Sequence, residues 1–328
     1  MAKGRKTIYN LIATEEAMEK VNQDNLKLLE EWEMYLRASS RSPQTIMNYI
    51  SDIKIFFVFL LTYCDNKFFG DIIPRDIVKF QATCMDVWKL SGNRIRRLKD
   101  VLSSFSNYVE QFYKDDERLK DFKNITRVVP QPKREKSREE TELTDADIKT
   151  IMEGLIEYEY YNAACMLALA LYGGLRKGEI TQIKTDTFDK EQIVGNLYKT
   201  TEVIKLKGDY KNHAYFIKQE VDRFVYLWKR QRKRMFRKYG RPEPEIEQYL
   251  FINYHNGKWK RYDTASMSYF SEAITKIAKE SGVNKDFYWE TARIFGLGKI
   301  KTAKLTEDEK KLMLQNYSIK EKARYKKL

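Results

Sequence analysis

Two arginines and a tyrosine in this sequence have the chemistry needed to cleave a phosphodiester. Tyr325 follows Arg293 by 32 positions (293 to 325), and Arg176 lies upstream, directly after a Gly-Gly-Leu sequence. A phenol can attack phosphorus and hold the phosphate covalently, while arginines present planar, permanently charged forks to its oxygens. These residues predict a site for DNA strand chemistry.

The charge of the chain favours an anionic partner. Among 328 residues, 61 are Lys or Arg and 47 are Asp or Glu, which leaves a net charge of +14. Such an excess favours a polyanion, with nucleic acid as the leading candidate, over an acidic small molecule. We therefore expect double-stranded DNA as the partner, and no cofactor or small-molecule substrate.

The cysteines and the hydropathy of the sequence indicate the cellular compartment of the protein. The three cysteines, Cys64, Cys84 and Cys165, are far apart and odd in number, which favours neither disulfides nor a metal site. The longest apolar run, residues 55–61, is far shorter than the roughly 20 residues that span a bilayer. No apolar segment follows the basic N-terminus, as it would in a secretory signal. We expect no membrane association and a reducing cytoplasm.

Apolar periodicity divides the chain into two domains. Residues 12–115 are predicted to form four short helices, one of them with Ser42 as N-cap and Pro43 at its first position. Between positions 123 and 142 the periodicity lapses into a charged, proline-containing stretch. We therefore expect a helical DNA-binding domain over residues 1–122, a charged linker over 123–142, and a second domain over 143–328.

The second domain is predicted to combine helices with small hairpins. Thr144 and Asp147 have capping-box spacing, and residues 163–171 and 221–239 favour helix. Alternation over residues 201–217 predicts a β-hairpin, and an Asn-Gly pair at 256–257 predicts another. The predicted fold class is therefore mainly α with small β-hairpins (α+β).

Three segments together resemble the motifs of the tyrosine recombinases, which include the phage integrases. Residues 314–325 resemble Leu-Gly-His-Ser-Ser-Ile-x-Thr-Thr-x-x-Tyr position for position, and residues 168–180 resemble the motif of the first catalytic arginine. Residues 42–56 resemble the core-binding domain of the family. The resemblance implies an N-terminal four-helix core-binding (SAM-like) domain followed by a tyrosine-recombinase catalytic-type domain.

The resemblance also implies a catalytic set. In this set the arginines bind the phosphate, the tyrosine attacks it, and a hairpin lysine protonates the leaving oxygen. Lys205 and Lys211 are close alternatives for that lysine. The implied members are Arg176, Lys207, Arg293 and Tyr325.

Two positions depart from the family pattern. The family's His-x-x-Arg begins with Glu290, and the histidine expected after Leu-Gly is Asn316. At about 4 Å and an effective dielectric near 20, an ionised Glu290 would repel a phosphate charge by about 4 kcal/mol. Alternatively, Glu290 pairs with Arg293 or Arg176 and holds the arginines as a rigid scaffold. Asn316 can hydrogen-bond a phosphate but cannot accept a proton near neutral pH.

Basic residues on two helices are predicted to contact DNA. In the first domain they lie mostly off the apolar stripe of the helix that begins near Ser91, where an ordinary solvated face is the alternative. In the second domain they crowd the helix over residues 221–239. The candidates are Arg94, Arg96, Arg97, Lys99, Lys229, Arg230, Lys233 and Arg234.

Three functions stay open at this point. We favour a sequence-specific DNA-binding protein with impaired catalysis that acts as a phage or prophage transcriptional repressor in lysogeny, similar to the integrase-like master repressors of SPβ-type phages. The second is an active site-specific recombinase with Tyr325 as nucleophile, and the third is an architectural or RNA-binding protein. Only three residues follow Tyr325, so we expect no tail exchange within a recombination tetramer. Self-association on DNA stays open, and we expect the protein on DNA in the bacterial cytoplasm.

Overall fold

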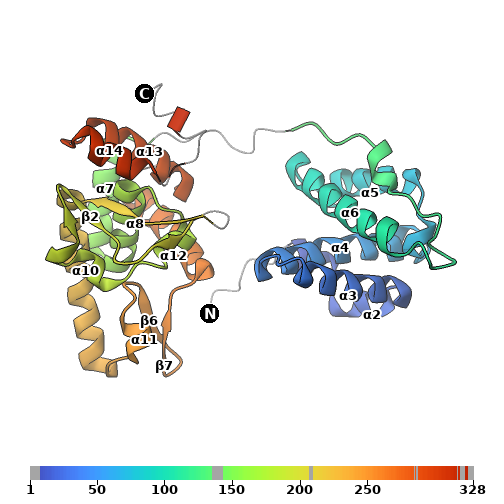
Figure 1. The fold of residues 1–328 in the computed structure, drawn as a ribbon, viewed down its shortest axis with the longest axis horizontal. Helices are drawn as coiled ribbons and strands as arrows, with labels where there is room; N and C mark the ends of the chain where they lie inside the picture. Colours follow the sequence, from blue (N-terminus) through green and yellow to red (C-terminus); the bar gives the residue numbers. More distant parts are fainter. Residues whose placement is uncertain are drawn as a thin grey trace. The chain divides into compact units, whose positions relative to one another are not determined.

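The chain forms two compact units, Met1–Glu139 and Glu140–Leu328 (Figure 1). The computed structural model describes residues 8–134, 143–206, 210–283, 285, 287–315, 317 and 322–323. Each unit has its own hydrophobic core. The predicted site residues Lys207, Asn316 and Tyr325 lie outside the described residues.

The first unit is helical, and two of its helices begin where the sequence predicts. Ser42 caps one helix by accepting a hydrogen bond from the Thr45 amide, and Ser91 caps another through the Arg94 amide. The four predicted helices are therefore confirmed, with two short helices before them. The elements are α1 (Ile8–Ile12), α2 (Glu15–Lys20), α3 (Gln23–Ala38), α4 (Pro43–Tyr63), η1 (Phe69–Asp71), α5 (Pro74–Asp86), α6 (Gly92–Phe112) and η2 (Ile125–Val128).

Aromatic side chains fill the core of this unit. Phe105 of α6 lies 5.1 Å from the Trp32 ring and 4.6 Å from the Phe69 ring, measured between ring centroids. Helix α4 has the length and composition that could cross a membrane, but residues 55–60 in its middle are all buried in this core. Burial against α3 and α6 accounts for its apolar character.

Residues 123–132, which the sequence places in an exposed linker, pack on the first unit instead. Asn124 is buried, and its side-chain amide donates to the Ser103 carbonyl at 3.1 Å and to Asn107 Oδ1 at 2.8 Å. Val129 is also buried against this core. An Asx-type hydrogen-bond network and one apolar anchor hold this segment, and neither has the periodicity of a helix or a strand.

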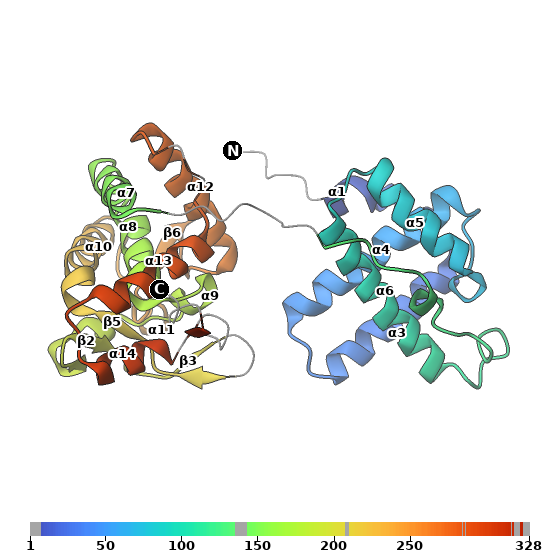
Figure 2. The same ribbon diagram turned by 90° about the horizontal axis from the view of Figure 1, so that it is seen from above.

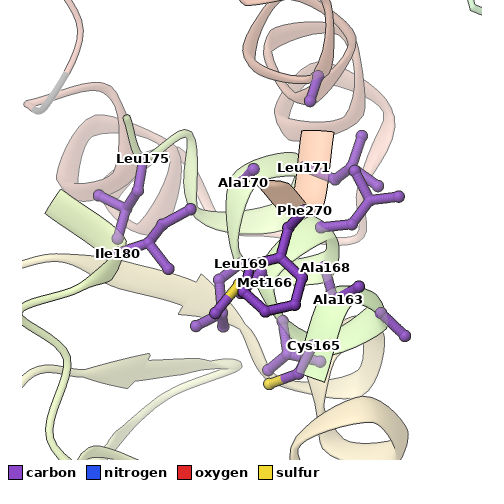
Figure 3. Close-up of a cluster of buried hydrophobic side chains, with 14 of the residues drawn as sticks. Ala163, Cys165, Met166, Ala168, Leu169, Ala170, Leu171, Leu175, Ile180 and Phe270 are labelled. Carbon is purple, nitrogen blue, oxygen red and sulfur yellow. The ribbon is translucent and has the colours of Figure 1, made fainter. Parts of the chain in front are cut away.

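The second unit is built around one buried helix, α8. Helices α7, α10, α12 and α13 all contact α8, which lies in the middle of the unit (Figure 2). Its side chains are buried on every side, and Figure 3 shows Phe270 of α12 among them. The helical elements are α7 (Asp145–Glu157), α8 (Tyr161–Gly173), α9 (Lys177–Ile180), η3 (Thr185–Phe188), η4 (Lys190–Gln192), α10 (Lys218–Tyr239), α11 (Pro244–Glu247), α12 (Thr264–Glu280), α13 (Trp289–Thr302) and α14 (Glu307–Leu314).

The strands of the second unit are short and antiparallel. The predicted hairpin over residues 201–217 is only partly correct, because its last residues, Tyr215–Ile217, pair with Leu197–Lys199. The Asn256-Gly257 hairpin is confirmed, with φ of 49° and 76° at the two turn residues. The strands are β1 (Ile193–Val194), β2 (Leu197–Lys199), β3 (Ile204–Lys205), β4 (Lys211–Asn212), β5 (Tyr215–Ile217), β6 (Ile252–His255) and β7 (Lys258–Arg261), in sheets β1-β2-β5, β3-β4 and β6-β7. The mainly α fold class with small hairpins is confirmed.

Helix α13 approaches α8 closely at Gly296. A Cβ atom at Gly296 would lie 2.1 Å from the Leu171 carbonyl oxygen, whereas a Cβ atom at Gly298, on the same helix, would have no atom within 4 Å. The close approach places the α13 backbone against the end of α8. Gly296 therefore sets how near the two helices come.

We predict opposite effects for alanine at these two glycines. Gly296→Ala is expected to lower the free energy of unfolding by about 1–3 kcal/mol, because the helices must separate. Gly298→Ala is expected to raise it by about 0.5–1 kcal/mol through helix propensity alone. Urea unfolding of the full chain measures both, and equal effects of the two changes would contradict the close approach.

Candidate functional site

Arg176 is held at the sharp turn that follows α8. Gly174 has φ of 67°, a left-handed conformation that glycine adopts without strain, and it ends the helix. Arg176 then caps α9, its backbone N–H donating to Glu179 Oε2 at 2.7 Å and its Nη1 donating to Glu179 Oε1 at 3.1 Å. Glu179 is buried while the Arg176 side chain is partly exposed. The carboxylate therefore fixes both the backbone and the guanidinium of Arg176.

Arg293 of α13 is anchored to the same turn. Its Nε donates to the Gly174 carbonyl at 2.7 Å, and the side chain is only 1% exposed. Its Nη1 lies 3.5 Å from Glu290 Oε2, one turn back on the helix. The structure therefore connects the two key arginines through the segment 174–176. Of the two expectations for Glu290, the structure contains the pairing with Arg293.

Tyr317 completes the surroundings of Arg293 and was not among the predicted residues. The Arg293 guanidinium lies 5.2 Å from the centroid of the buried Tyr317 ring, a cation–π distance. A Cβ atom at Gly174 would lie 1.9 Å from the Tyr317 hydroxyl, so the glycine makes room for this ring. The available signal was a tyrosine where the recombinase motif has serine, directly after Asn316.

The lysine hairpin is tied to its neighbours through main-chain and amide groups. Gln182 accepts from the Lys205 N–H at 2.8 Å and donates to the Lys205 carbonyl at 2.9 Å. Asn212 of β4 donates to Gln315 Oε1 at 3.0 Å. Since Gln315 directly precedes Asn316, the base of the hairpin contacts the start of the tail motif. Sequence reasoning missed both glutamines.

A basic groove lies on the first unit. Asp52 of α4 has a side chain only 3% exposed, and its two oxygens lie 2.5 Å from Arg94 Nη2 and 3.2 Å from Arg97 Nε. The groove has a volume of about 900 Å³, and Asp52, Arg94 and Arg97 line it. Further cations on its wall are Arg37, Arg41 and Lys54. One buried carboxylate thus fixes two guanidinium groups on one turn of α6.

The other two predicted residues of α6 are engaged elsewhere. Arg96 Nη1 donates to the Pro132 carbonyl at 2.7 Å. Lys99 donates to the Val129 carbonyl, is 6% exposed, and has its pKa lowered by burial. The prediction that Lys99 contacts DNA is therefore corrected, because the chain over residues 129–132 covers it.

On α10 the predicted cations differ in exposure. Arg230, Lys233 and Arg234 are exposed, whereas Lys229 is partly buried and lies 3.3 Å from Asp189 Oδ1. Another cation of α10, Arg232, was not among the predicted DNA contacts and is buried. The helix therefore presents one charged face and buries one guanidinium.

The part of the chain that the structure describes contains no candidate metal site. No group of three His, Cys, Asp or Glu side chains there could hold a metal ion. The three cysteines are buried and free, and burial raises the pKa of the Cys84 thiol to about 12. None of these thiols has the exposure or lowered pKa of a reactive cysteine.

We predict that the two carboxylates beside the arginines, Glu179 and Glu290, contribute differently to the free energy of unfolding. Glu179→Gln is expected to cost about 1.5–3 kcal/mol of unfolding free energy, since it removes buried, charge-assisted hydrogen bonds. Glu290→Gln is expected to cost less than about 1 kcal/mol, because that side chain is 63% exposed. Chemical denaturation at neutral pH compares them. A larger loss for Glu290→Gln would refute this geometry.

Comparison with known proteins gives one relative in sequence. No family model matches the chain. Over 268 residues it is 28% identical to the SPbeta prophage-derived recombinase-like protein YomM of Bacillus subtilis (strain 168), an alignment that covers 80% of this chain and 76% of that protein.

Solved structures share the fold over most of the chain. A lambda integrase(75-356) dimer bound to a COC' core site matches with a TM-score of 0.60 at 15% identity, over 89% of this chain and 94% of that one. The XerH site-specific recombinase bound to difH substrate matches with a TM-score of 0.60 at 13% identity, over 97% and 92%. The Tn1549 transposon integrase in complex with circular intermediate DNA matches with a TM-score of 0.57 at 13% identity, over 91% and 94%. The resemblance to recombinases and integrases is confirmed, and the chain has the tyrosine-recombinase fold.

Proposed function

We propose that this chain is a sequence-specific double-stranded DNA-binding protein, impaired in strand cleavage, that represses transcription from a phage or prophage genome. The observation that carries the proposal is the state of Arg293. Its guanidinium bonds the Gly174 carbonyl, pairs with Glu290 and stacks on Tyr317. A phosphate would have to compete with these three partners for the Arg293 guanidinium.

Glu290 also opposes negative charge that develops on a nearby phosphate. An unscreened carboxylate at about 4 Å, with an effective dielectric near 20, would oppose it by about 4 kcal/mol. Because the Glu290 side chain is 63% exposed, solvent reduces this repulsion to about 1 kcal/mol, or about fivefold in rate. Glu290 and Asn316 also leave both histidine positions without an imidazole, and general acid–base catalysis typically contributes about 100-fold to 10,000-fold. DNA binding requires neither stabilisation of the transition-state charge nor proton transfer, so it can persist when cleavage is impaired.

Charge and fold support DNA as the partner. The net charge of +14 and the groove that holds Arg94 and Arg97 provide cations for phosphates. The solved structures with this fold include a lambda integrase dimer bound to a COC' core site, a lambda integrase tetramer bound to a Holliday junction and the XerH recombinase bound to difH substrate. We extend DNA binding and self-association on DNA to this chain, with double-stranded DNA as its partner.

The repressor role rests on the relative and on the altered site together. The related protein YomM is prophage-derived and recombinase-like. A prophage protein that keeps a DNA-binding fold but no longer cleaves DNA could still regulate transcription during lysogeny. We therefore propose that this chain acts on DNA in the bacterial cytoplasm. Fold alone does not imply this function, so the test must separate binding from chemistry.

An active recombinase is the second candidate. The partly exposed guanidinium of Arg176, fixed by Glu179 at the position of the family's first arginine, favours it. The residues that would act are Arg176, Lys207, Arg293 and Tyr325.

We predict that the protein forms no covalent DNA adduct. A nicked suicide duplex carrying the bound site, run on a denaturing gel, should give no band above that of Tyr325→Phe. The double change Glu290→His and Asn316→His restores the family residues and should increase the adduct. An adduct from the unchanged protein that Tyr325→Phe abolishes would establish the recombinase instead.

We predict that Arg94 and Arg97 carry much of the DNA affinity. Arg94→Glu with Arg97→Glu should weaken binding at least about tenfold and reduce the log–log salt slope by about two units, because each arginine that neutralises a phosphate contributes close to one unit. The control is Lys120→Glu with Lys123→Glu, an equal charge change at exposed positions outside the groove. Fluorescence anisotropy at several salt concentrations measures both. Equal reductions of affinity in the two variants would contradict a specific role for the groove.

A further inference from the structure

Arg232, in the middle of α10, is a buried cation with an incomplete set of partners. The residue is only 5% exposed, and its Nη2 donates to the Glu247 carbonyl at 2.8 Å. Its Nε has no hydrogen-bond partner among the described residues. The Glu247 carboxylate is bound by Arg241 rather than by Arg232. Within the described part of the chain, no carboxylate forms an ion pair with Arg232.

Burying a guanidinium without a carboxylate partner lowers the stability of the folded protein. A guanidinium removed from water loses its hydration, and only paired charge and hydrogen bonds offset that loss. Burial lowers the pKa of Arg232 to about 10, so it remains charged at neutral pH. The ring of Phe236, 5.4 Å from the guanidinium carbon, gives a weaker compensation. The local charge is therefore unbalanced.

A cavity lies beside this arginine. Its volume is about 500 Å³, within the usual range of small-molecule sites. Lys229, Arg232, Lys233 and Arg241 all line it, and Glu247 is the one acidic residue on its wall. Lys229 also forms an ion pair with Asp189, whose side chain is mostly exposed. Four cations thus surround the space with one carboxylate.

We propose that this cavity binds the phosphate group of a small molecule, with Arg232 as the recessed cation and Lys233 and Lys229 at the rim. The guanidinium stays charged and attracts phosphate oxygens even though Nη2 is occupied by the Glu247 carbonyl. A terminal phosphate carries close to two negative charges, which balances this excess better than the single charge of a DNA phosphodiester. The depth of Arg232 also favours a small ligand over the outer surface of a rigid duplex.

The site is separate from the proposed cleavage centre. None of its lining residues belongs to the segment 174–176 or to α13, which contains Arg293. The inference goes beyond the proposed function and does not depend on it, because the cavity can bind an anion whether or not the chain represses or recombines DNA.

Titration calorimetry of the full-length protein with inorganic phosphate tests the proposal. Saturable binding at one site is expected, with a dissociation constant of roughly 1 mM or below, and none with chloride at equal ionic strength. Arg232→Gln should abolish the binding. Lys233→Ala should weaken it at least about threefold, while Arg234→Ala, an exposed neighbour outside the cavity, should leave it unchanged.

Two further measurements, on a second variant and in the presence of duplex DNA, complete the test. Should Arg232→Gln fail to fold, the double change Lys229→Ala with Lys233→Ala, at the cavity rim, must remove phosphate binding. Phosphate heats that match chloride, or that persist unchanged in this double variant, would overturn the site. Saturation with duplex DNA is expected to leave phosphate affinity within about twofold. The proposal thus replaces the sequence-based prediction that Lys229 and Lys233 contact DNA. Displacement of phosphate by DNA would support that earlier prediction, assign these cations to the DNA backbone and overturn the small-molecule proposal.

Discussion

The hydrogen bond from Arg293 Nε to the Gly174 carbonyl is the interaction on which the site depends. It joins α13 to the turn after α8, where Arg176 begins α9. The bond exists because Gly296 lets α13 approach α8 and because Gly174 tolerates both a left-handed backbone and the Tyr317 ring. Two glycines and one buried arginine thus bring together residues from α13 and the turn after α8.

Local signals in the sequence predicted most of the fold but not the long-range contacts. Ser42 and Thr144 mark helix starts through short-range hydrogen bonds, and the Asn256-Gly257 turn needs only its own backbone geometry. Lys99 was misplaced because the segment that covers it lies 30 residues away in the chain. Tyr317 was missed for the same reason, since its role depends on three other segments meeting around it. Lys207, Asn316 and Tyr325 stay sequence-based predictions.

The two acidic residues near the arginines illustrate how one fold can keep its framework while its chemistry changes. Glu179 is buried and binds the backbone and side chain of Arg176, so it belongs to the framework. Glu290 is exposed and pairs with Arg293 at the position where the recombinase motif has histidine. A carboxylate there changes the charge seen by a phosphate without disturbing the core.

We propose that the Arg293 guanidinium binds groups of the protein itself, the Gly174 carbonyl and Glu290, rather than a DNA phosphate. A crystal structure of the chain bound to its duplex DNA tests this most directly. The account predicts that Arg293 Nε still donates to the Gly174 carbonyl and that Glu290 still pairs with the guanidinium, with no phosphate oxygen within hydrogen-bond distance of Arg293. A structure in which Glu290 has turned away, and both Arg176 and Arg293 bind one phosphate beside the Tyr325 phenol, would contradict it.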